Sequence, residues 1–171
     1  MNFVEIETMI LDQIQTIHRP VLDAVMVYIT RLGDHGTIWI LTAFVFLCTK
    51  KYRKGGMVIC LALIFSFILG NLIIKNLVAR PRPCWVNDTV QLLISVPGDY
   101  SFPSAHTMSS FAAATAIFFM NKSWGITALL LAGAIAFSRM YLYVHYPTDI
   151  LAGAVLGVFV AYAAKWGLPK R

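Results

Sequence analysis

Most of the residues that could do chemistry in this chain fall into three short blocks. In chain order, the blocks are Lys75-x(6)-Arg82-Pro83, Pro103-Ser104-Ala105-His106 and Ser138-Arg139-x(5)-His145-x(3)-Asp149. An arginine guanidinium can hold two phosphate oxygens at once, a lysine ammonium supplies a point charge, and imidazole can act as a nucleophile or an acid. Alone, Lys75 or Arg139 would be an anchor at the edge of an apolar segment, and Arg82 a solvated loop charge. Together, the three cations and two histidines suit the binding and transfer of a phosphoryl group.

Spacing within the blocks relates several of these residues to the starts of helices. His145 and Asp149 are four residues apart, which places two side chains on one helical face, and Pro147 suits the first turn of that helix. A carboxylate in this position can accept from one imidazole nitrogen and leave the other nucleophilic. Ser104 precedes an apolar run, where backbone N–H groups can bind an anion. The simpler alternatives are a structural His–Asp pair and a helix cap at Ser104.

The composition is typical of a polytopic membrane protein. Of the 171 residues, 58% are hydrophobic and 13% charged, with a mean hydropathy of +0.71, whereas soluble proteins are roughly 45–50% apolar and about 25% charged. The net charge of +6 is spread between apolar segments, so we attribute it to topology and an anionic substrate and expect no nucleic-acid partner. The cysteines lack metal-ligand spacing, and Asp88 and Asp99 stand alone in a loop. We therefore expect neither a metal nor another cofactor.

Six apolar segments follow a short amphipathic start. Ile6, Ile10 and Ile14 share one face of residues 1–19, which predicts a helix lying in the membrane interface. The expected crossings of a bilayer with roughly 30 Å of hydrocarbon are residues 21–33, 37–49, 57–79, 103–120, 124–146 and 147–167. The fold class is thus predicted to be all-α, with a six-helix transmembrane bundle over 20–171 that forms a single domain together with 1–19.

The last of these segments carries a stripe of small residues. Asp149, Gly153, Gly157 and Ala161 recur every four residues, a pattern that lets helices pack closely. We therefore expect this face, and Asp149 with it, to point into the bundle.

The distribution of basic residues predicts which side faces the cytoplasm. With six crossings, one side holds nine basic residues: Arg19, Lys50, Lys51, Arg53, Lys54, Lys122, Lys165, Lys170 and Arg171. The other side holds five: Arg31, Lys75, Arg80, Arg82 and Arg139. The positive-inside rule then places both termini in the cytoplasm and all three blocks at the outer face.

In this order and spacing, the three blocks resemble the signature of the type 2 phosphatidic acid phosphatase family, membrane lipid phosphatases related to the vanadium haloperoxidases. The family pattern is K-x(6)-R-P, then P-S-G-H, then S-R-x(5)-H-x(3)-D. The chain departs from it only at Ala105, where the family usually has glycine. Alanine keeps the backbone N–H and adds one methyl group, so we expect the phosphate cradle to persist.

The resemblance implies a role for each matching residue. His145 would be the nucleophile that forms a phosphohistidine, Asp149 would hold its ring, and His106 would protonate the leaving oxygen. The phosphate oxygens would be bound by Lys75, Arg82, Ser104, Arg139 and the N–H groups near Ala105.

The resemblance also implies a metal-independent lipid phosphatase of the bacterial cytoplasmic membrane, with its substrate among the membrane lipids. Undecaprenyl pyrophosphate is the favoured substrate, because release of phosphate from the spent carrier fits an outward-facing site. Phosphatidylglycerophosphate or phosphatidic acid is the alternative. A non-catalytic protein that binds lipid phosphates is a further alternative, but it would need the cations without the two histidines.

Overall fold

The computed structural model describes residues 3–168, which form helices and connecting loops without a β-strand in that range. The prediction of an all-α fold is confirmed. The helices are α1 (Phe3–Gln15), α2 (Pro20–Leu32), the 3-10 turn η1 (Asp34–Gly36), α3 (Thr37–Cys48), α4 (Arg53–Ser66), the π-helical η2 (Phe67–Ile74), α5 (Lys75–Val78), α6 (Pro83–Val86), α7 (Ala105–Met120), α8 (Lys122–Tyr141) and α9 (Pro147–Trp166).

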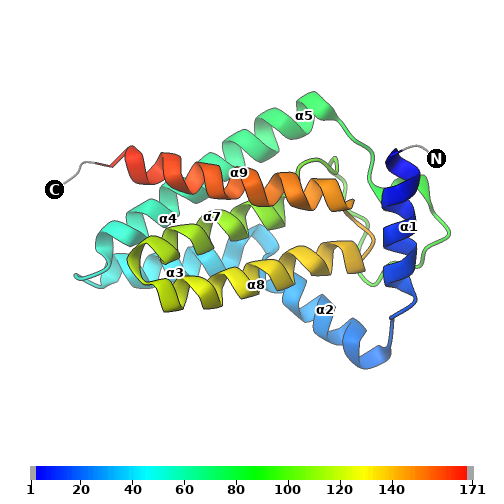
Figure 1. Cartoon of the computed structure of the whole chain (residues 1–171), viewed down its shortest axis with the longest axis horizontal. Helices are drawn as coiled ribbons and strands as arrows, with labels where there is room; N and C mark the ends of the chain where they lie inside the picture. The colour runs from blue at the N-terminus through cyan, green and yellow to red at the C-terminus, as the bar shows by residue number, and fades with distance from the viewer. Residues whose placement is uncertain (1–2, 169–171) are drawn as a thin grey trace.

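The bundle is built around α7, which packs against α4, α8 and α9 (Figure 1). Three stretches are long and apolar enough to cross a membrane, namely Arg53–Val86, Lys122–Tyr141 and Pro147–Trp166. Asp34–Cys48 and Ala105–Met120 are apolar but shorter. Together with the family described below, these helices define an integral membrane protein.

The small-residue stripe on α9 faces α7, as the sequence predicts. A Cβ atom on Gly153 would lie 2.8 Å from the backbone oxygen of Ser104, and one on Gly157 would lie 2.5 Å from that of Met108. Asp149 and Ala161 on the same face are fully buried. The stripe therefore sets the close approach of α9 to the start of α7.

Helix α2 stays at one end of the bundle. At its beginning, Asp23 accepts a hydrogen bond from the Tyr141 hydroxyl at the end of α8. Near its other end, Thr30 accepts one from Arg139 Nη1 at 2.7 Å. Both ends of α2 thus contact the last turn of α8, and the sixth membrane crossing is not confirmed.

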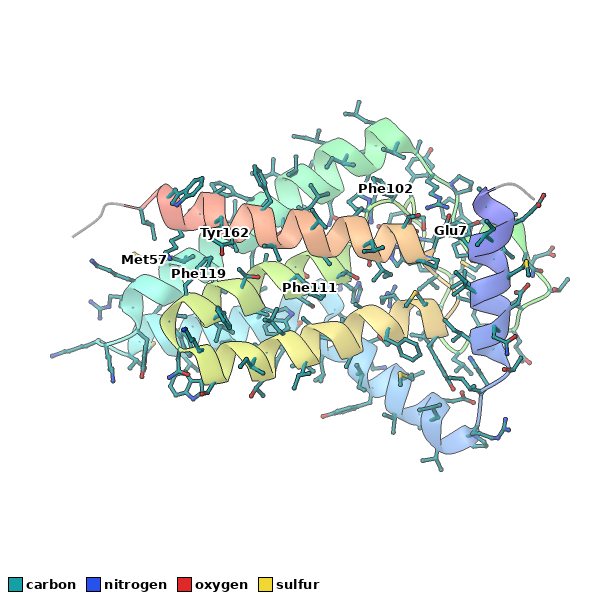
Figure 2. All side chains as sticks on the ribbon, viewed as in Figure 1. Glu7, Met57, Phe102, Phe111, Phe119 and Tyr162 are labelled. Atoms are coloured by element: carbon teal, nitrogen blue, oxygen red, sulfur yellow. The ribbon has the colours of Figure 1, made fainter. Side chains whose placement is uncertain are left out.

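Helix α1 lies across this same end of the bundle, whereas α9 ends at the opposite end (Figure 1). The outer face of α1 exposes apolar side chains, including Ile6 and Ile10, while Glu7 and Leu11 are buried on its inner face. Figure 2 shows Glu7 at this end and Phe119 and Tyr162 at the other. The expected placement of both termini on one side is therefore not confirmed.

The connection between α8 and α9 differs from the predicted segment 124–146. Helix α8 ends at Tyr141, and the chain turns at Tyr143, whose φ is 59°. The apolar residues Leu142, Tyr143 and Val144 are buried in a cluster outside the helix, which explains why hydropathy alone extended the segment. His145 consequently lies in the turn that precedes α9.

Candidate active site

A cavity of about 930 Å³ extends from the turn before α9 and the start of α7 along α3, α4 and η2. Six of the eight predicted site residues line it: Lys75, Arg82, Ala105, His106, Arg139 and His145. The other two, Ser104 and Asp149, are fully buried. Both imidazoles and all three predicted cations therefore share one cavity, although they come from distant parts of the chain.

The three cations of the cavity are almost fully buried. Lys75, Arg82 and Arg139 are 3%, 2% and 4% exposed. Lys75 directly follows η2, and π-helical distortions are frequent at functional sites. Arg139 donates to Thr30, but its buried Nε has no hydrogen-bond partner among residues 3–168. Because an unpaired buried donor on a cation is costly, this cluster is suited to a bound anion.

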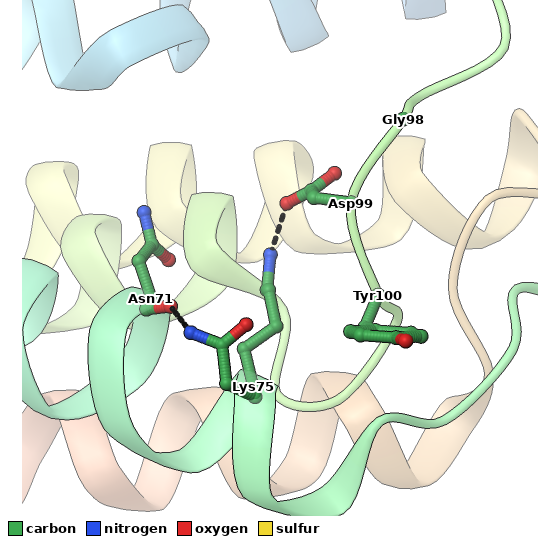
Figure 3. Close-up of a pocket in the computed structure, with 6 residues that line it drawn as sticks. Asn71, Lys75, Gly98, Asp99 and Tyr100 are labelled. Atoms are coloured by element: carbon green, nitrogen blue, oxygen red, sulfur yellow. Dashed lines mark hydrogen bonds and ion pairs between the residues drawn. The ribbon is translucent and has the colours of Figure 1, made fainter.

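Asp99, on the loop between α6 and α7, interacts with two of these cations. Its carboxylate is bonded to Lys75 Nζ (Figure 3) and accepts from Arg82 Nη2 at 2.6 Å. Partial burial opposes ionisation, but the hydrogen bonds and charges of Lys75 and Arg82 prevail and lower the pKa of Asp99 to about 2. The expectation that Asp99 stands alone is wrong, because its loop folds back over the site.

His145 and Asp149 are neighbours, but not through a shared helical face. Tyr146 is the N-cap of α9, and Asp149 Oδ2 folds back to accept from its N–H at 2.9 Å. His145 Nδ1 lies 3.5 Å from Asp149 Oδ2 and 3.4 Å from Ser101 Oγ. Its other nitrogen, Nε2, lies 3.1 Å from Arg82 Nη1. The ring thus directs Nδ1 towards acceptors and Nε2 towards the cations.

The surroundings of His145 keep its ring neutral. Burial, followed by the positive charges of Arg82 and Arg139, lowers the pKa of His145 well below its usual value. At pH 7 one nitrogen therefore carries a proton and the other a lone pair. Because Nδ1–H points to Asp149, the lone pair lies on Nε2, which faces the cations. A phosphoryl group bound by these cations would be within the reach of this lone pair.

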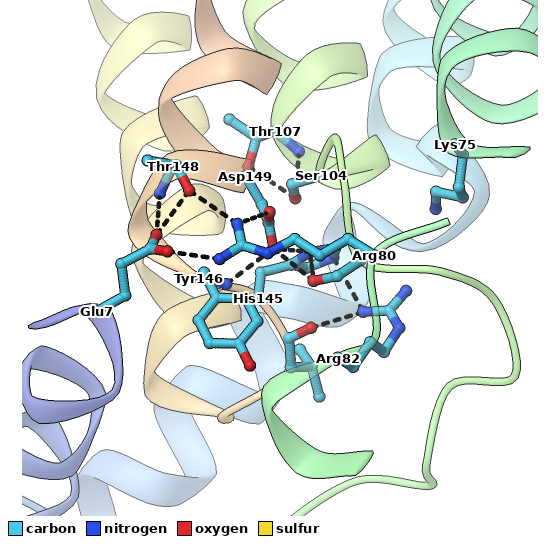
Figure 4. Close-up of polar contacts among 12 residues, drawn as sticks. Glu7, Lys75, Arg80, Arg82, Ser104, Thr107, His145, Tyr146, Thr148 and Asp149 are labelled. Atoms are coloured by element: carbon cyan, nitrogen blue, oxygen red, sulfur yellow. Dashed lines mark hydrogen bonds and ion pairs between the residues drawn. The ribbon is translucent and has the colours of Figure 1, made fainter. Parts of the chain in front are cut away.

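A second layer of polar residues surrounds Asp149 (Figure 4). The Ser101 hydroxyl donates to Oδ2, and Arg80 Nη1 donates to Oδ1 at 2.7 Å. Arg80 Nη2 also donates to Glu7 Oε2 at 2.5 Å. Sequence reasoning missed these three residues: the repeated Arg-Pro pair at residues 80–83 was a signal for Arg80, whereas no local pattern links Glu7 to the site.

His106, in the first turn of α7, has its own carboxylate partner. Its Nε2 lies 2.9 Å from Asp34 Oδ1 in η1. A carboxylate at one imidazole nitrogen fixes the tautomer and orientation of the ring. Asp34 was not singled out from the sequence, and its exposed neighbour His35, with a φ of 53°, has no motif that assigns it a role.

Ser104 and Ala105 form the start of α7. Ser104 Oγ accepts from the Thr107 N–H at 3.5 Å and from the Thr107 hydroxyl at 3.0 Å, so it acts as a helix cap. Ala105 is the first residue of the helix and lines the cavity. Its φ is not among the positive values found at non-glycine residues of the described chain. Alanine therefore replaces the family glycine without backbone strain.

The site combines buried cations, two imidazoles that each lie beside a carboxylate, and apolar helices. A comparison with protein-family models agrees with this arrangement. The model of the PAP2 superfamily matches residues 55–171, and the chain belongs to this superfamily. The family resemblance of the three blocks is thereby confirmed.

Individual relatives are similar over most of the chain. Undecaprenyl-diphosphatase BcrC of Bacillus subtilis (strain 168) is 31% identical over 145 residues, which cover 85% of this chain and 74% of that protein. An undecaprenyl-diphosphatase of Sulfolobus acidocaldarius is 29% identical over 142 residues, which cover 82% and 68%. The crystal structure of a PAP2-type phosphatidylglycerolphosphate phosphatase from Bacillus subtilis has a TM-score of 0.74 at 26% identity, over 98% of this chain and 87% of that one.

Proposed function

We propose that this protein is a lipid phosphatase that removes the terminal phosphate from undecaprenyl pyrophosphate through a phosphohistidine intermediate. The observation that carries the proposal is the single cavity shared by Lys75, Arg82, Arg139 and both imidazoles. Relatives named undecaprenyl-diphosphatase, which match most of the chain, support this choice of substrate.

The remaining wall of the cavity favours a lipid substrate. It is largely apolar and is formed by side chains of α3, α4 and η2: Ile40, Ala43, Phe44, Leu47, Cys60, Leu63, Ile64 and Phe67. Several of these side chains are exposed, with Ile40, Phe44, Ile64 and Phe67 all more than half exposed. A phosphorylated head group could be held by the cations while its hydrocarbon chain stays along this wall and in the bilayer.

In the first chemical step, the lone pair of His145 Nε2 attacks the terminal phosphorus. The bond between phosphorus and the leaving oxygen breaks, and His106 supplies the proton that this oxygen requires. Lys75, Arg82 and Arg139 hold the phosphoryl oxygens, and the Asp149 carboxylate stabilises the positive charge that develops on the His145 ring. The products are a phosphohistidine and undecaprenyl phosphate.

In the second step, water attacks the phosphorus of the phosphohistidine. His106, now without its proton, accepts one from the water, and the bond between phosphorus and His145 Nε2 breaks. Inorganic phosphate leaves, and both histidines return to their starting states. Asp34 keeps the His106 ring oriented through both proton transfers.

The membrane arrangement that fits best has five crossings: α3, the continuous α4–η2–α5 helix, α7, α8 and α9. Six described basic residues lie at the end opposite the site: Lys50, Lys51, Arg53, Lys54, Lys122 and Lys165. The site end also holds six described basic residues, but Lys75, Arg82 and Arg139 are buried in the cavity and Arg80 is paired with Glu7 and Asp149. Arg19 and Arg31 are the two that are exposed there, against six exposed basic residues at the opposite end. The positive-inside rule therefore favours a cytoplasmic C-terminal end and an extracytoplasmic active site in the cytoplasmic membrane.

Helix α1 completes this arrangement as an interfacial helix on the side of the active site. Its outer face presents Val4, Ile6, Met9 and Ile10, with exposures between 42% and 57%, to the boundary between lipid and water. Its inner face joins the bundle through Glu7 and Leu11. Residues 1–171 thus form one domain, with α1 as part of the site and not as a separate module.

The test is phosphate release by the purified protein from undecaprenyl pyrophosphate, phosphatidylglycerophosphate and phosphatidic acid, with and without a chelator. We expect the highest kcat/KM for undecaprenyl pyrophosphate, no effect of the chelator, and a loss of turnover of about 10³-fold or more in His145→Ala. A preference for phosphatidylglycerophosphate would favour the function named for the solved relative. Full turnover in His145→Ala would refute the mechanism, and binding without turnover in the wild type would identify a lipid-phosphate binder.

A further inference from the structure

Glu7 is a buried carboxylate on a helix that otherwise covers the end of the bundle. It is 2% exposed. Its Oε2 accepts from Arg80 Nη2 at 2.5 Å, and its Oε1 accepts from the Thr148 N–H at 3.0 Å and from the Thr148 hydroxyl at 2.6 Å. Buried carboxylates are retained only with such partners. The partners here are Arg80, which contacts Asp149, and Thr148, which directly precedes Asp149 in the chain.

Arg80 lies between Glu7 and Asp149, and it is linked to both carboxylate oxygens of Asp149. Its Nη1 donates to Asp149 Oδ1 at 2.7 Å and to Thr148 Oγ1 at 2.8 Å. Its backbone oxygen accepts from the Ser101 N–H at 2.9 Å, and the Ser101 hydroxyl is bonded to Asp149 Oδ2. The guanidinium also lies 3.9 Å from the centre of the Tyr146 ring. Each contact fixes Arg80 in one orientation, and Arg80 in turn fixes Asp149.

The charges of this network matter as much as its geometry. Asp149 can stabilise a positive imidazole ring only while its own negative charge is not cancelled. Arg80 alone would cancel that charge, because it is bonded directly to Asp149. Glu7, on the other side of the guanidinium, supplies a second negative charge. The three groups together therefore keep a net charge of about −1 beside His145, by counting one charge on each.

We propose that Glu7 and Arg80 are positioning residues of the active site, which hold Asp149 and preserve its negative charge for the reacting His145. The inference rests on the proposed role of His145 as nucleophile. It makes α1 a functional part of the enzyme, because this helix supplies Glu7, the carboxylate on the other side of the Arg80 guanidinium.

The inference predicts a change in the pH profile. His145 is faced by Asp149 from α9, Arg82 from the loop before α6, Lys75 from α5, Arg139 from α8 and His106 from α7. Glu7→Gln removes one negative charge and leaves Arg80 to cancel that of Asp149. The His145 ring is then harder to protonate and a weaker nucleophile. The acid limb of kcat/KM, which reports the free enzyme, moves to lower pH.

The experiment measures kcat, KM and the pH profile of the full-length protein on undecaprenyl pyrophosphate, together with inhibition by inorganic phosphate. For Glu7→Gln we expect kcat to fall on the order of tenfold, with KM and phosphate inhibition little changed because the cations are untouched. Arg80→Lys keeps the charge but cannot serve Glu7, Thr148 and Asp149 at once. For Arg80→Lys we expect a similar fall in kcat but no shift of the acid limb, because the net charge of the network is unchanged. This variant keeps the test open if Glu7→Gln does not fold.

Asp12→Asn is the matched control on the same helix. Asp12 accepts from the Tyr143 hydroxyl at 2.7 Å, so its loss loosens the attachment of α1 without touching Arg80 or Asp149. We expect Asp12→Asn to lower the thermal midpoint while kcat and the acid limb stay at wild-type values. Wild-type kcat in Glu7→Gln and Arg80→Lys, or an equal loss in Asp12→Asn, would overturn the inference. Full activity in His145→Ala would instead overturn the proposed function on which it rests.

Discussion

At the scale of single residues, Asp99 is an acidic residue within the cation cluster of the proposed active site. Its carboxylate lies between Lys75 and Arg82, the cations expected to bind phosphate. A phosphate must therefore displace a carboxylate before it binds both cations. Because the Asp99 side chain is 55% exposed on its loop, this displacement does not require a rearrangement of the helices.

Replacement of Asp99 by Asn should strengthen substrate binding. The amide keeps the shape of the side chain but no longer competes through charge for Lys75 and Arg82. We expect KM to fall roughly fivefold, which corresponds to the ~1 kcal/mol typical of an exposed ion pair. Steady-state kinetics and inhibition by inorganic phosphate measure the effect. An unchanged or higher KM would show that Asp99 does not compete with the substrate.

Asp99 should also give the protein a stability that depends on acid pH. Its folded-state pKa is lowered from 3.8 to about 2, so its stabilising contribution is complete above the unfolded value of roughly 3.9 and is lost as pH falls towards 2. The thermal midpoints of wild type and Asp99→Asn should therefore differ at pH 5 and converge near pH 2. A constant difference across this range would exclude the ion pairs as its source.

At this scale, the sequence predicted the residues that carry charge or a reactive nitrogen but not those that hold them. The family spacing marks His145 and Asp149 because both lie in one short block. Arg80 and Ser101 contact Asp149, and Glu7 contacts Arg80, only after distant segments fold together. Their polar side chains have no periodicity that distinguishes them from ordinary surface residues.

At the scale of the elements, the contact between α7 and α9 positions most of the site. Ser104 caps α7, and its backbone N–H donates to the Asp149 backbone oxygen at 3.1 Å. Gly153 and Gly157 keep the two helices close enough for this contact. The start of one helix is thereby fixed against the start of the other, with His145 and His106 on either side of the junction.

Alanine substitutions along α9 should separate stability from activity. Gly157→Ala places a Cβ 2.5 Å from the Met108 backbone oxygen and should destabilise the protein by about 1–3 kcal/mol. Gly153→Ala meets the Ser104 backbone oxygen instead, so it should also lower kcat. Thermal unfolding and phosphate release measure the two effects.

Gly133→Ala in α8 is the control for these variants, because a Cβ there meets nothing within 4 Å. It should be neutral or stabilise the helix by up to about 1 kcal/mol. A similar loss of stability in all three variants would show that the α7–α9 contact has no special role.

The helices themselves were predictable from apolar segments and helix-start signals, but their ends and paths were less so. Pro147 and Ser104 are at helix starts, as their residue types predict. Hydropathy could not detect the turn after Tyr141, because the turn residues are apolar and buried. Hydropathy also could not distinguish α2, which stays at one end of the bundle, from α3, which is proposed to cross the membrane. The two helices are both apolar and similar in length.

At the scale of the whole molecule, the polar site and the basic end lie at opposite ends of an apolar bundle. The loop that carries Asp88 and Asp99 lies with the site, and the turn at residues 49–52 lies at the other end. This polarity gives the protein one orientation in a membrane under the positive-inside rule. In the orientation proposed above, phosphate is released on the side away from the cytoplasm.

Labelling of single cysteines should reveal this orientation. In a variant with Cys48, Cys60 and Cys84 replaced by alanine, Asp88→Cys should react with a membrane-impermeant maleimide added to intact cells. Lys51→Cys should react only after the membrane is opened. Both positions are exposed, so access to reagent depends on the side of the membrane. The reverse pattern would place the active site in the cytoplasm.

The central claim is that the lone pair of His145 Nε2 attacks phosphorus in the cavity formed with Lys75, Arg82 and Arg139. The most direct measurement is rapid quenching of the enzyme with undecaprenyl pyrophosphate labelled in its terminal phosphate, followed by mapping of the protein-bound label. We predict a base-stable, acid-labile phosphohistidine at His145 that forms and decays at rates compatible with turnover and is absent in His145→Ala. Label at another residue, or phosphate release without any labelled protein under conditions that would detect the intermediate, would contradict the account.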